Sequence, residues 1–455
     1  MHRYTGEIDA LSREIDASIR ERISQPQPLD HPRSLEELTA AAGTTITPGG
    51  LGGDEALRIW NEVLAPACVS TDHPANLAFV PAAPTKSSIL FDLVVGASSI
   101  IASAWIDASG VIYAENQALR WISDLVGLPT EAGGVFVSGG SAANLSAMVT
   151  GRHTMQTRRE AAGRERPARW KVAASDAVHS SVITACRVMD AEVLAVSVDD
   201  RGRMTGPALE AALDAAGAGV DDLFGVVATG GTTNAGIVDD LEGIAEVCSR
   251  RGLWFHVDAA YGGAALVSDR TRSLFAGIEH ADSVTIDPHK WLFAPFDCAA
   301  LVYRDPSLAR VALAQEASYL DTVTEDREWS PMHYAYHLTR RARGMPFWFS
   351  LAVHGTDAYR EAVDRVLDIT AATAEEIRWR DELELVLSPE LSVVLFRRHG
   401  WEGSDYDAWS AKLLRDQIGY VLPTTWRGEK VVRMCFVNPE TTLEDVRPIL
   451  DTLHG

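Results

Sequence analysis

Short apolar runs alternate with longer amphipathic segments through the middle of the chain. The runs occupy residues 135–137, 171–174, 193–198, 223–229, 253–258, 283–286 and 299–303. Runs of this length are typical of strands that are buried on both faces of a parallel sheet, and the segments between them have a helical period. The pattern predicts an α/β fold in which a mostly parallel seven-stranded sheet carries helices on both faces.

Helical patterns dominate the residues before this region, and a mixed pattern follows it. Helices are predicted over residues 1–24 and 35–42, from Asp54 to about residue 65, and through most of 73–128. After residue 346 the pattern predicts a helix over 347–377 with an interruption near Gly355, strands over 383–387, 392–397 and 431–437, and a helix over 443–453. We therefore predict an N-terminal helical segment (1–72), a large domain (73–345) and a small α+β domain (346–455).

Composition narrows the class of protein. Of the 455 residues, 46% are hydrophobic and 23% are charged, which is typical of a soluble globular protein, and the net charge is −22. This charge argues against a nucleic-acid partner and against an anionic membrane surface, because both favour Lys and Arg. The first residues lack the pattern of a signal peptide, and Asp92 and Gly96 interrupt the longest apolar stretch. We expect a cytoplasmic protein without a membrane span.

The cysteines suggest neither a disulfide framework nor a metal site. They lie at positions 68, 186, 248, 298 and 435, an odd number without C-x-x-C spacing. We expect all five to be buried thiols in a reducing compartment, and we expect no metal ligands.

Candidate chemistry begins with one acid and one amine. Asp258 ends the run 253–258, and Lys290 follows the run 283–286 after an Asp-Pro-His turn. Ligands of open α/β sheets bind outside the carboxyl ends of the strands, so both side chains face one crevice. A lysine can form a Schiff base with a carbonyl cofactor, and a carboxylate can pair with a protonated pyridine nitrogen. A plain ion pair, or two unrelated surface residues, explains this pair alone equally well.

Three further turns fall on the same predicted edge. Gly139, Gly140 and Ser141 follow the run 135–137 and precede a helix, an arrangement that can bind phosphate or can be a plain capped turn. Hydroxyl-rich residues around Thr233 follow the run 223–229. His179 follows the run that starts at residue 171, and its imidazole could stack on a planar cofactor, although a lone histidine is more often structural.

In chain order these segments read SGGSAANL, DAVHSSV, GTTNAG, HVDAAYGGA and DPHKW. The set resembles the pyridoxal phosphate (PLP)-dependent amino-acid decarboxylases of the aromatic-L-amino-acid and glutamate decarboxylase group. The resemblance extends from about residue 73 to about residue 442. It implies a PLP-dependent transferase fold of the aspartate-aminotransferase type, with PLP bound in the large domain. It also implies a homodimer with active sites at the subunit interface.

The resemblance also implies roles for individual residues. Lys290 would hold PLP as an aldimine, Asp258 would keep the pyridine nitrogen protonated, and His179 would stack on the ring. The remaining cofactor contacts would come from Gly140, Ser141, Thr233, Asp287 and His289. The implied reaction is decarboxylation of an L-amino acid to the amine and carbon dioxide through a quinonoid intermediate.

The substrate end of the site is less defined by sequence. Phe79, Pro81, Trp105 and Ile106 resemble the aromatic-binding part of the family, so an aromatic substrate is expected. Core packing explains these aromatic residues equally well, and an acidic or other non-aromatic substrate is the alternative. The arginines at 340, 341 and 343 do not clearly mark a dicarboxylate pocket.

The residue that protonates the substrate carbon is also open. In the aromatic decarboxylases a loop tyrosine assists this step, but an ungapped alignment puts Pro331 there, so Tyr334 and Tyr336 become the candidates. They lie in a predicted functional loop, 310–343, which also holds Gln315, Tyr319, Thr322, Thr324, Arg327 and Trp329. If neither tyrosine acts, oxidative deamination to an aldehyde is the alternative. A PLP-fold binding protein without turnover is the hypothesis of a different class.

Overall fold

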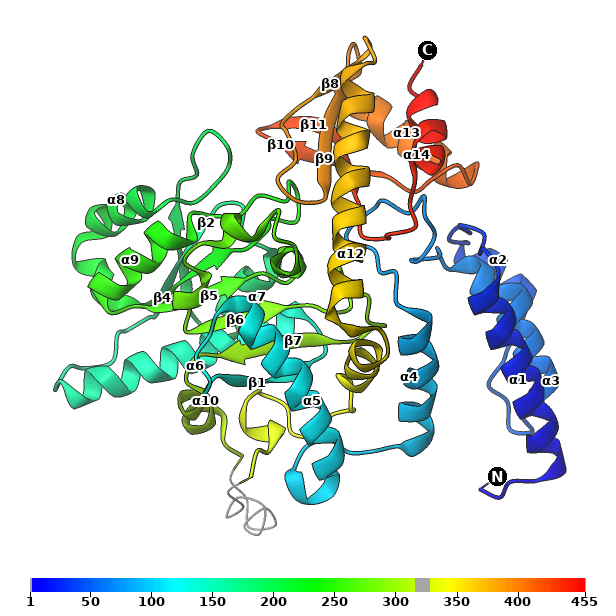
Figure 1. The fold of residues 1–455 in the computed structure, drawn as a ribbon, viewed down its shortest axis with the longest axis horizontal. Helices are drawn as coiled ribbons and strands as arrows, with labels where there is room; N and C mark the ends of the chain where they lie inside the picture. Colours follow the sequence, from blue (N-terminus) through cyan, green and yellow to red (C-terminus); the bar gives the residue numbers. More distant parts are fainter. Residues whose placement is uncertain (1, 316–327, 455) are drawn as a thin grey trace. The chain divides into compact units, whose positions relative to one another are not determined.

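The computed structural model describes residues 2–315 and 328–454, and the chain forms two compact units (Figure 1). The larger unit contains Ala82–Ala374 and Leu387–Val394, and the smaller contains Met1–Pro81, Glu375–Val386 and Leu395–Gly455. The predicted division at residues 72 and 345 stays a prediction. Of the predicted functional loop, Tyr319, Thr322, Thr324 and Arg327 lie outside the described residues.

A seven-stranded sheet forms the centre of the larger unit. Its strands are β1 (Gly133–Val137), β2 (Lys171–Ser175), β3 (Glu192–Val196), β4 (Leu223–Thr229), β5 (Trp254–Asp258), β6 (Ser283–Ile286) and β7 (Ala299–Tyr303). They lie in the order β1-β7-β6-β5-β4-β2-β3. β7 is antiparallel to β1 and to β6, whereas the pairs β2–β3, β2–β4, β4–β5 and β5–β6 are parallel. The seven predicted strands and the mostly parallel sheet are confirmed.

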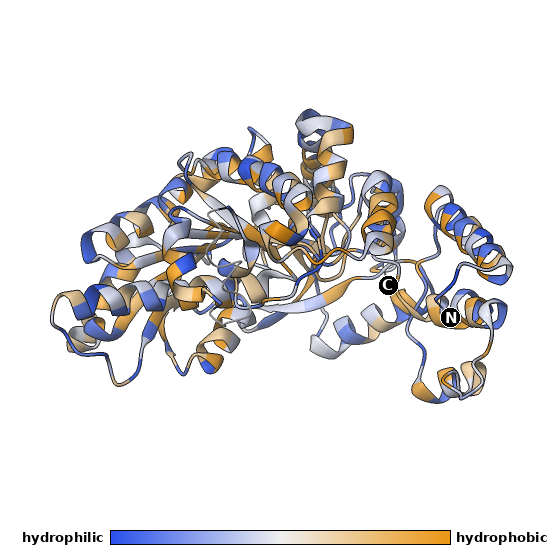
Figure 2. Ribbon diagram, turned by 90° about the horizontal axis from the view of Figure 1, so that it is seen from below, coloured by the Kyte–Doolittle hydropathy of each residue, from blue (hydrophilic) through white to orange (hydrophobic). Residues whose placement is uncertain are grey.

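Helices cover this sheet on both faces. They are α5 (Trp105–Val126), α6 (Gly140–Ala161), α7 (Ser180–Val188), α8 (Gly206–Ala216), α9 (Leu241–Arg251) and α10 (Pro306–Leu313), and the larger unit also contains α4 (Lys86–Ser98). Alternation along β5 directs Trp254 and His256 toward α6 and Phe255 toward the opposite face. Figure 2 shows that these helices carry hydrophilic residues beside hydrophobic ones, as expected for helices that bury one side.

Close packing of α6 against the sheet depends on a glycine. A Cβ atom at Gly151 would lie 2.7 Å from the ring of Trp254 on β5. Ala143 and Ala147 of the same helix belong to a core cluster with that tryptophan. Small residues on this face of α6 let the helix approach the sheet, which brings its first turn to the carboxyl ends of the strands.

The smaller unit combines helices with an antiparallel sheet. Its helices are α1 (Gly6–Ser24), α2 (Leu35–Ala42), α3 (Gly53–Ile59), the end of α12 (Met345–Arg378), α13 (Gly403–Arg415) and α14 (Leu443–Asp451). The strands β8 (Leu383–Leu385), β9 (Val393–Arg398), β10 (Leu422–Trp426) and β11 (Glu429–Cys435) lie in the order β10-β11-β9-β8. The predicted interruption of the long helix is confirmed at Gly355, which has a φ of 74°. Sequence reasoning missed β10, because an edge strand tolerates Pro423 and polar residues that weaken the strand pattern.

Two expectations about local structure were wrong. Helix does not fill residues 73–85, because Pro74, Pro81 and Pro84 interrupt the segment and α4 begins only at Lys86. Cys68 is exposed, since it follows a short 3-10 turn at the surface, whereas the other four cysteines are buried. In the part of the chain that the structure describes, no helix has the length and apolar character needed to cross a membrane.

Candidate active site

A cavity of about 370 Å³ lies where the parallel strands of the larger unit end. The turns after β1, β2, β4, β5 and β6 all contribute to its walls. All eight residues predicted to bind the cofactor line it: Gly140, Ser141, His179, Thr233, Asp258, Asp287, His289 and Lys290. The other lining residues include Asn144, Ser181, Thr229, Tyr261 and Phe296. The fold therefore brings together residues that are separated by more than 150 positions in the sequence.

Lys290 follows the turn after β6 and forms an ion pair with Asp287. Its Nζ lies 2.9 Å from Oδ2 of Asp287, and that carboxylate is almost fully buried. The backbone N–H of Gly140 donates to the same oxygen at 3.2 Å. Nδ1 of His289 accepts a hydrogen bond from the backbone of Cys298, and burial lowers the pKa of this histidine. The amine is thus held beside one carboxylate at the cavity wall.

Asp258 ends β5 and presents a buried carboxylate to the cavity. Its Oδ1 accepts a hydrogen bond from the backbone N–H of Ala260 at 3.1 Å, and its Oδ2 accepts one from Asn144 Nδ2 at 2.7 Å. Neither donor is a cationic side chain. The carboxylate is therefore held in one orientation by neutral donors, and it can pair with a cationic nitrogen of a ligand.

The N-terminus of α6 forms another wall of the cavity. Gly140 is the first residue of this 22-residue helix, Ser141 follows it, and both line the cavity. A Cβ atom at Gly140 would lie 3.1 Å from Oδ2 of Asp287, so the glycine allows the helix to start close to that acid. Backbone N–H groups at the start of a helix favour an anionic ligand.

His179 and the Thr-rich turn form the remaining polar walls. His179 is the N-cap residue of α7, and its Nδ1 accepts a hydrogen bond from the backbone N–H of Ser181 at 3.2 Å. The turn that contains Thr233 follows β4, and Gly231 in it has a φ of 113°. A Cβ atom at Gly231 would meet Gly262 at 2.9 Å, so only glycine fits this close approach of two turns.

The residues of the cavity fit pyridoxal phosphate. The cavity offers a helix N-terminus with a serine for a phosphate, a buried carboxylate for a pyridine nitrogen, and a lysine amine for an aldehyde. Two buried oxygens on its walls, Asp287 Oδ1 and Thr229 Oγ1, have no hydrogen-bond partner among the described residues. Unpaired buried polar atoms are costly in a folded protein, so a polar ligand at this place is expected.

The two candidate tyrosines have different surroundings. Tyr334 is buried, and its ring stacks on that of Trp329 at 4.0 Å between centroids. Tyr336 is 51% exposed and lines a second cavity of about 350 Å³, whose walls include Ser138, Ser141 and Ser181. These three serines also line the cavity described above, so Tyr336 lies beside that site.

The residues predicted to bind substrate do not line the 370 Å³ cavity. Trp105 packs against a hydrophobic cluster that includes Ile112 and Met345, and the neighbouring Ile106 is exposed. Phe79 and Pro81 belong to the smaller unit, where the ring of Phe79 is exposed and makes an edge contact with Tyr420. The role of these four residues stays a prediction.

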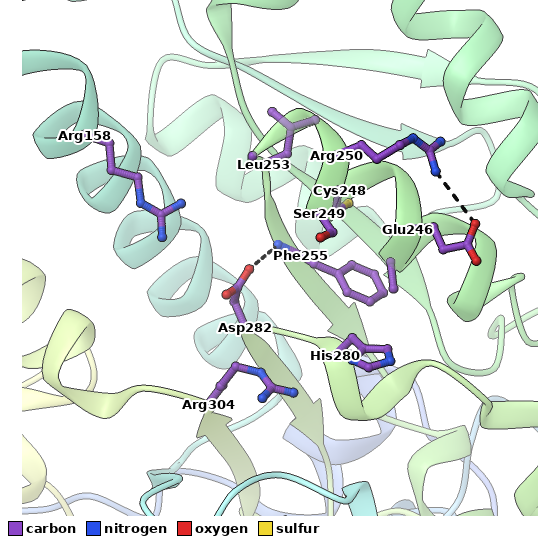
Figure 3. A pocket seen from close by; sticks show the side chains of 12 residues that line it. Arg158, Glu246, Cys248, Ser249, Arg250, Leu253, Phe255, His280, Asp282 and Arg304 are labelled. Carbon is purple, nitrogen blue, oxygen red and sulfur yellow. Dashed lines mark hydrogen bonds and ion pairs between the residues drawn. The ribbon is translucent and has the colours of Figure 1, made fainter. Parts of the chain in front are cut away.

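A larger cavity, of about 650 Å³, lies at the opposite edge of the sheet (Figure 3). Arg250 and Glu246 of α9 form an ion pair there, and Asp282 accepts a hydrogen bond from the backbone N–H of Phe255. Its walls contain arginines and acids but no lysine. Size alone would therefore select a place that lacks the amine, and the chemistry of the side chains identifies the smaller cavity as the candidate site.

Residues that sequence reasoning missed include Asn144, Ser181, Tyr261 and Phe296. The first three lie within the segments SGGSAANL, DAVHSSV and HVDAAYGGA. These segments pointed to the site, but the sequence did not show which other groups the three residues contact. Tyr261 stacks on Trp291 with 5.6 Å between ring centroids. Phe296, whose ring lies 4.8 Å from that of His289, had no such signal.

Comparisons with known proteins identify the family of this chain. A family model, the pyridoxal-dependent decarboxylase conserved domain, matches residues 55–399. The chain is 30% identical over 419 residues to an aromatic-L-amino-acid decarboxylase of Bacillus atrophaeus, with 89% of this chain and 86% of the relative covered. It is 32% identical over 393 residues to an L-2,4-diaminobutyrate decarboxylase of Rhizobium meliloti (strain 1021), with 84% and 77% covered.

A solved structure of Oryza sativa TDC with PLP and tryptamine has the same fold. It matches with a TM-score of 0.90 at 22% identity, over 100% of this chain and 98% of that chain. The predicted fold type and the predicted cofactor are confirmed. The chain belongs to the pyridoxal-dependent decarboxylase family, and it is a carboxy-lyase that uses pyridoxal phosphate to decarboxylate an amino acid.

Proposed function

We propose that the substrate of this decarboxylase is an aromatic L-amino acid, which it converts to the amine and carbon dioxide. The observation that supports the site is the convergence of Lys290, Asp258 and His179 on one cavity beside the N-terminus of α6. An amine, a buried acid and an imidazole on the walls of one polar cavity match the needs of this cofactor chemistry.

Pyridoxal phosphate, when bound, supplies an aldehyde that captures amines and a protonated ring that accepts the electron pair left behind by carbon dioxide. In our proposal Lys290 would hold the cofactor through its amine. Asp258 keeps a proton at the ring nitrogen, since its carboxylate is buried and fixed by two neutral donors. A proton held at that nitrogen would favour the loss of carbon dioxide.

The remaining cofactor contacts are proposed from the same geometry. Gly140 and Ser141 bind the phosphate at the start of α6, and Thr233 contributes to the same pocket from the turn after β4. His179 packs against the ring. Asp287 holds Lys290 in place through the ion pair with its amine, and His289 supports this acid, since its Nε2 lies 3.6 Å from the same carboxylate oxygen.

For protonation of the substrate carbon we propose Tyr336 rather than Tyr334. Tyr336 is exposed at a cavity that shares serine walls with the cofactor site. The hydroxyl of Tyr334 belongs to a buried residue whose ring stacks on Trp329, and burial raises its pKa. A proton donor must reach the reacting carbon, and of the two tyrosines Tyr336 has the freer access to this region.

The charge distribution supports a substrate without a side-chain carboxylate. Arg340, Arg341 and Arg343 form ion pairs with Glu115, Asp92 and Asp297, respectively, so each guanidinium already has an acid beside it. Phe79, Pro81, Trp105 and Ile106 remain the proposed residues of the aromatic pocket. The two relatives named above carry the names of different substrates, so specificity has to be measured directly.

A substrate panel tests the proposal. The PLP-loaded protein is given L-tryptophan, L-tyrosine, L-2,4-diaminobutyrate, L-histidine and L-glutamate, and carbon dioxide, amine, aldehyde and peroxide are quantified. We expect equal amounts of amine and carbon dioxide, with the highest kcat/KM for an aromatic substrate, and no turnover by Lys290→Ala. A higher kcat/KM for glutamate or diaminobutyrate would refute the aromatic assignment. Aldehyde and peroxide in place of amine would refute simple decarboxylation.

A homodimer and a cytoplasmic location complete the proposal. The resemblance to the family implies active sites at a subunit interface, so we propose that two copies of this chain associate. Light scattering of the PLP-loaded protein after size exclusion tests this, and the mass of a single 49.3 kDa chain would contradict the dimer.

A further inference from the structure

Asn144, on the first turns of α6, lines the cofactor cavity and contacts four polar side chains. Its Nδ2 lies 2.7 Å from Oδ2 of Asp258 and 2.9 Å from Oγ of Ser181. Its Oδ1 lies 3.0 Å from Oγ1 of Thr285 and 3.1 Å from Nε2 of His256. All of these side chains are buried. The amide therefore has both donors and its acceptor engaged.

The partners fix the orientation of this amide. An ionised carboxylate can only accept, so Nδ2 of Asn144 must face Asp258, and Oδ1 must face His256. His256 then donates from Nε2, and its Nδ1 accepts from the hydroxyl of Ser283 at 2.8 Å. Burial lowers the pKa of His256 to about 4, which agrees with a neutral imidazole in this arrangement. Nδ1 also lies 3.2 Å from the backbone carbonyl oxygen of Ser283, and the orientation of the Asn144 amide rests on its contacts with Asp258 and with Nε2 of His256.

The amide of Asn144 is also connected, through Ser181, to the imidazole of His179 on another wall of the cavity. Oγ of Ser181 accepts from Asn144 and lies 2.8 Å from Nδ1 of His179. The backbone N–H of Ser181 also donates to this Nδ1 at 3.2 Å, so Nδ1 is the acceptor and the hydroxyl is a donor to it. His179 is thereby held with its proton on Nε2. One amide is thus hydrogen-bonded directly to Asp258 and through Ser181 to His179.

We propose that Asn144 is a positioning residue that fixes Asp258 and His179 relative to each other for their contacts with the pyridoxal ring. This inference rests on the proposed roles of those two residues. Without the amide donors, Asp258 keeps the backbone N–H of Ala260 as its one hydrogen-bond donor among the described residues, and Ser181 loses the group that orients its hydroxyl. The contacts of Asp258 and His179 with the pyridoxal ring should then both weaken, although neither of these two residues has been substituted.

Two substitutions separate positioning from simple packing. Asn144→Ala removes the amide, whereas Asn144→Asp keeps its shape and its acceptor oxygen but removes both donors. We expect each to raise the PLP dissociation constant at least tenfold, measured with the apoenzyme at pH 8, and to change the visible circular dichroism of the bound cofactor. Thr150→Val is the matched control, since Thr150 is a buried hydrogen-bonding residue of α6 outside the cavity, and we expect its constant within twofold of wild type.

The outcomes distinguish this inference from the proposed function. If Asn144→Asp binds PLP as tightly as wild type with the same dichroism while Asp258→Ala binds weakly, the positioning role alone is refuted. If Asp258→Ala also binds as wild type, the proposed role of Asp258 fails, and the inference fails with it. Ser181→Ala extends the test should Asn144→Ala not fold. It should change the dichroism through His179, and an unchanged spectrum would refute the connection to that residue.

Discussion

Nζ of Lys290 lies 2.9 Å from Oδ2 of Asp287, and the same oxygen accepts the backbone N–H of Gly140 at the start of α6. One carboxylate thus joins the amine to the helix. We predict that Asp287→Asn lowers PLP content and reduces kcat/KM by about tenfold or more, because the amide removes the charge that holds the lysine. Asp269→Asn, at an exposed position, should leave both unchanged. Normal PLP content and kcat/KM in Asp287→Asn would contradict this role.

Glu115 and Arg340 form a buried ion pair. Nη2 of Arg340 lies 2.8 Å and 2.6 Å from the two carboxylate oxygens, and the backbone N–H of Gly344 donates to one of them at 2.8 Å. We predict that Glu115→Gln lowers the free energy of unfolding by about 3 kcal/mol or more, because it leaves a buried guanidinium without its counter-charge. Urea unfolding measures the change.

An exposed ion pair provides the control for that measurement. Asp357 lies 3.3 Å from Arg360 on α12, and its side chain is exposed. Asp357→Asn should change the free energy of unfolding by no more than about 1 kcal/mol. Equal effects of the two substitutions would show that burial does not determine the contribution of the Glu115 pair.

His256 should make the folded state less stable in acid. Burial lowers its folded-state pKa to about 4, whereas an unfolded histidine titrates near ~6.5. Between these two pH values the histidine is protonated in the unfolded state but neutral in the folded state. The free energy of unfolding therefore decreases as the pH falls from about 6.5 to about 4, by up to about 3 kcal/mol. We predict that urea midpoints measured from pH 7 to pH 4 fall less steeply for His256→Gln than for wild type. His280→Gln, at an exposed site, should follow the wild-type curve, and parallel curves for His256→Gln would contradict the prediction.

The cysteines should differ sharply in reactivity. Cys68 is exposed, whereas the other four are buried, and burial raises the pKa of Cys186 to about 11. Thiolates are the reactive form, so we predict that Ellman's reagent titrates one thiol per native chain and five in denaturant. Cys68→Ser should abolish the native signal. More than one rapidly reacting thiol in the native protein would contradict the assigned burial.

Much of the larger unit could be predicted because its signals are local. Each strand of the seven-stranded sheet is a short apolar run, and each turn after a strand of the site carries its own polar residues. Parallel strands place their carboxyl ends on one edge, so Asp258 and Lys290 were expected to meet there, as the lining of the cavity confirms. The wrong predictions also have local causes. Pro423 weakened the strand pattern of β10, and three prolines prevent a helix over residues 73–85.

Contacts between distant residues were decided only by the tertiary structure. Arg340 lies 225 positions from Glu115, and no pattern in the sequence distinguishes its buried pairing from a substrate-binding role. Tyr334 and Tyr336 are two positions apart, yet one is stacked in the core and the other is exposed beside a cavity.

The sequence by itself indicated the family, the cofactor and eight of the residues that line the cavity, because each turn after a strand carries its polar residues in one short segment. Only the folded chain brought Asn144 between Asp258 and Ser181, since that contact needs α6 to pack on β5. The reason is physical: local sequence sets which groups each turn offers, whereas packing sets which of those groups hydrogen-bond to one another.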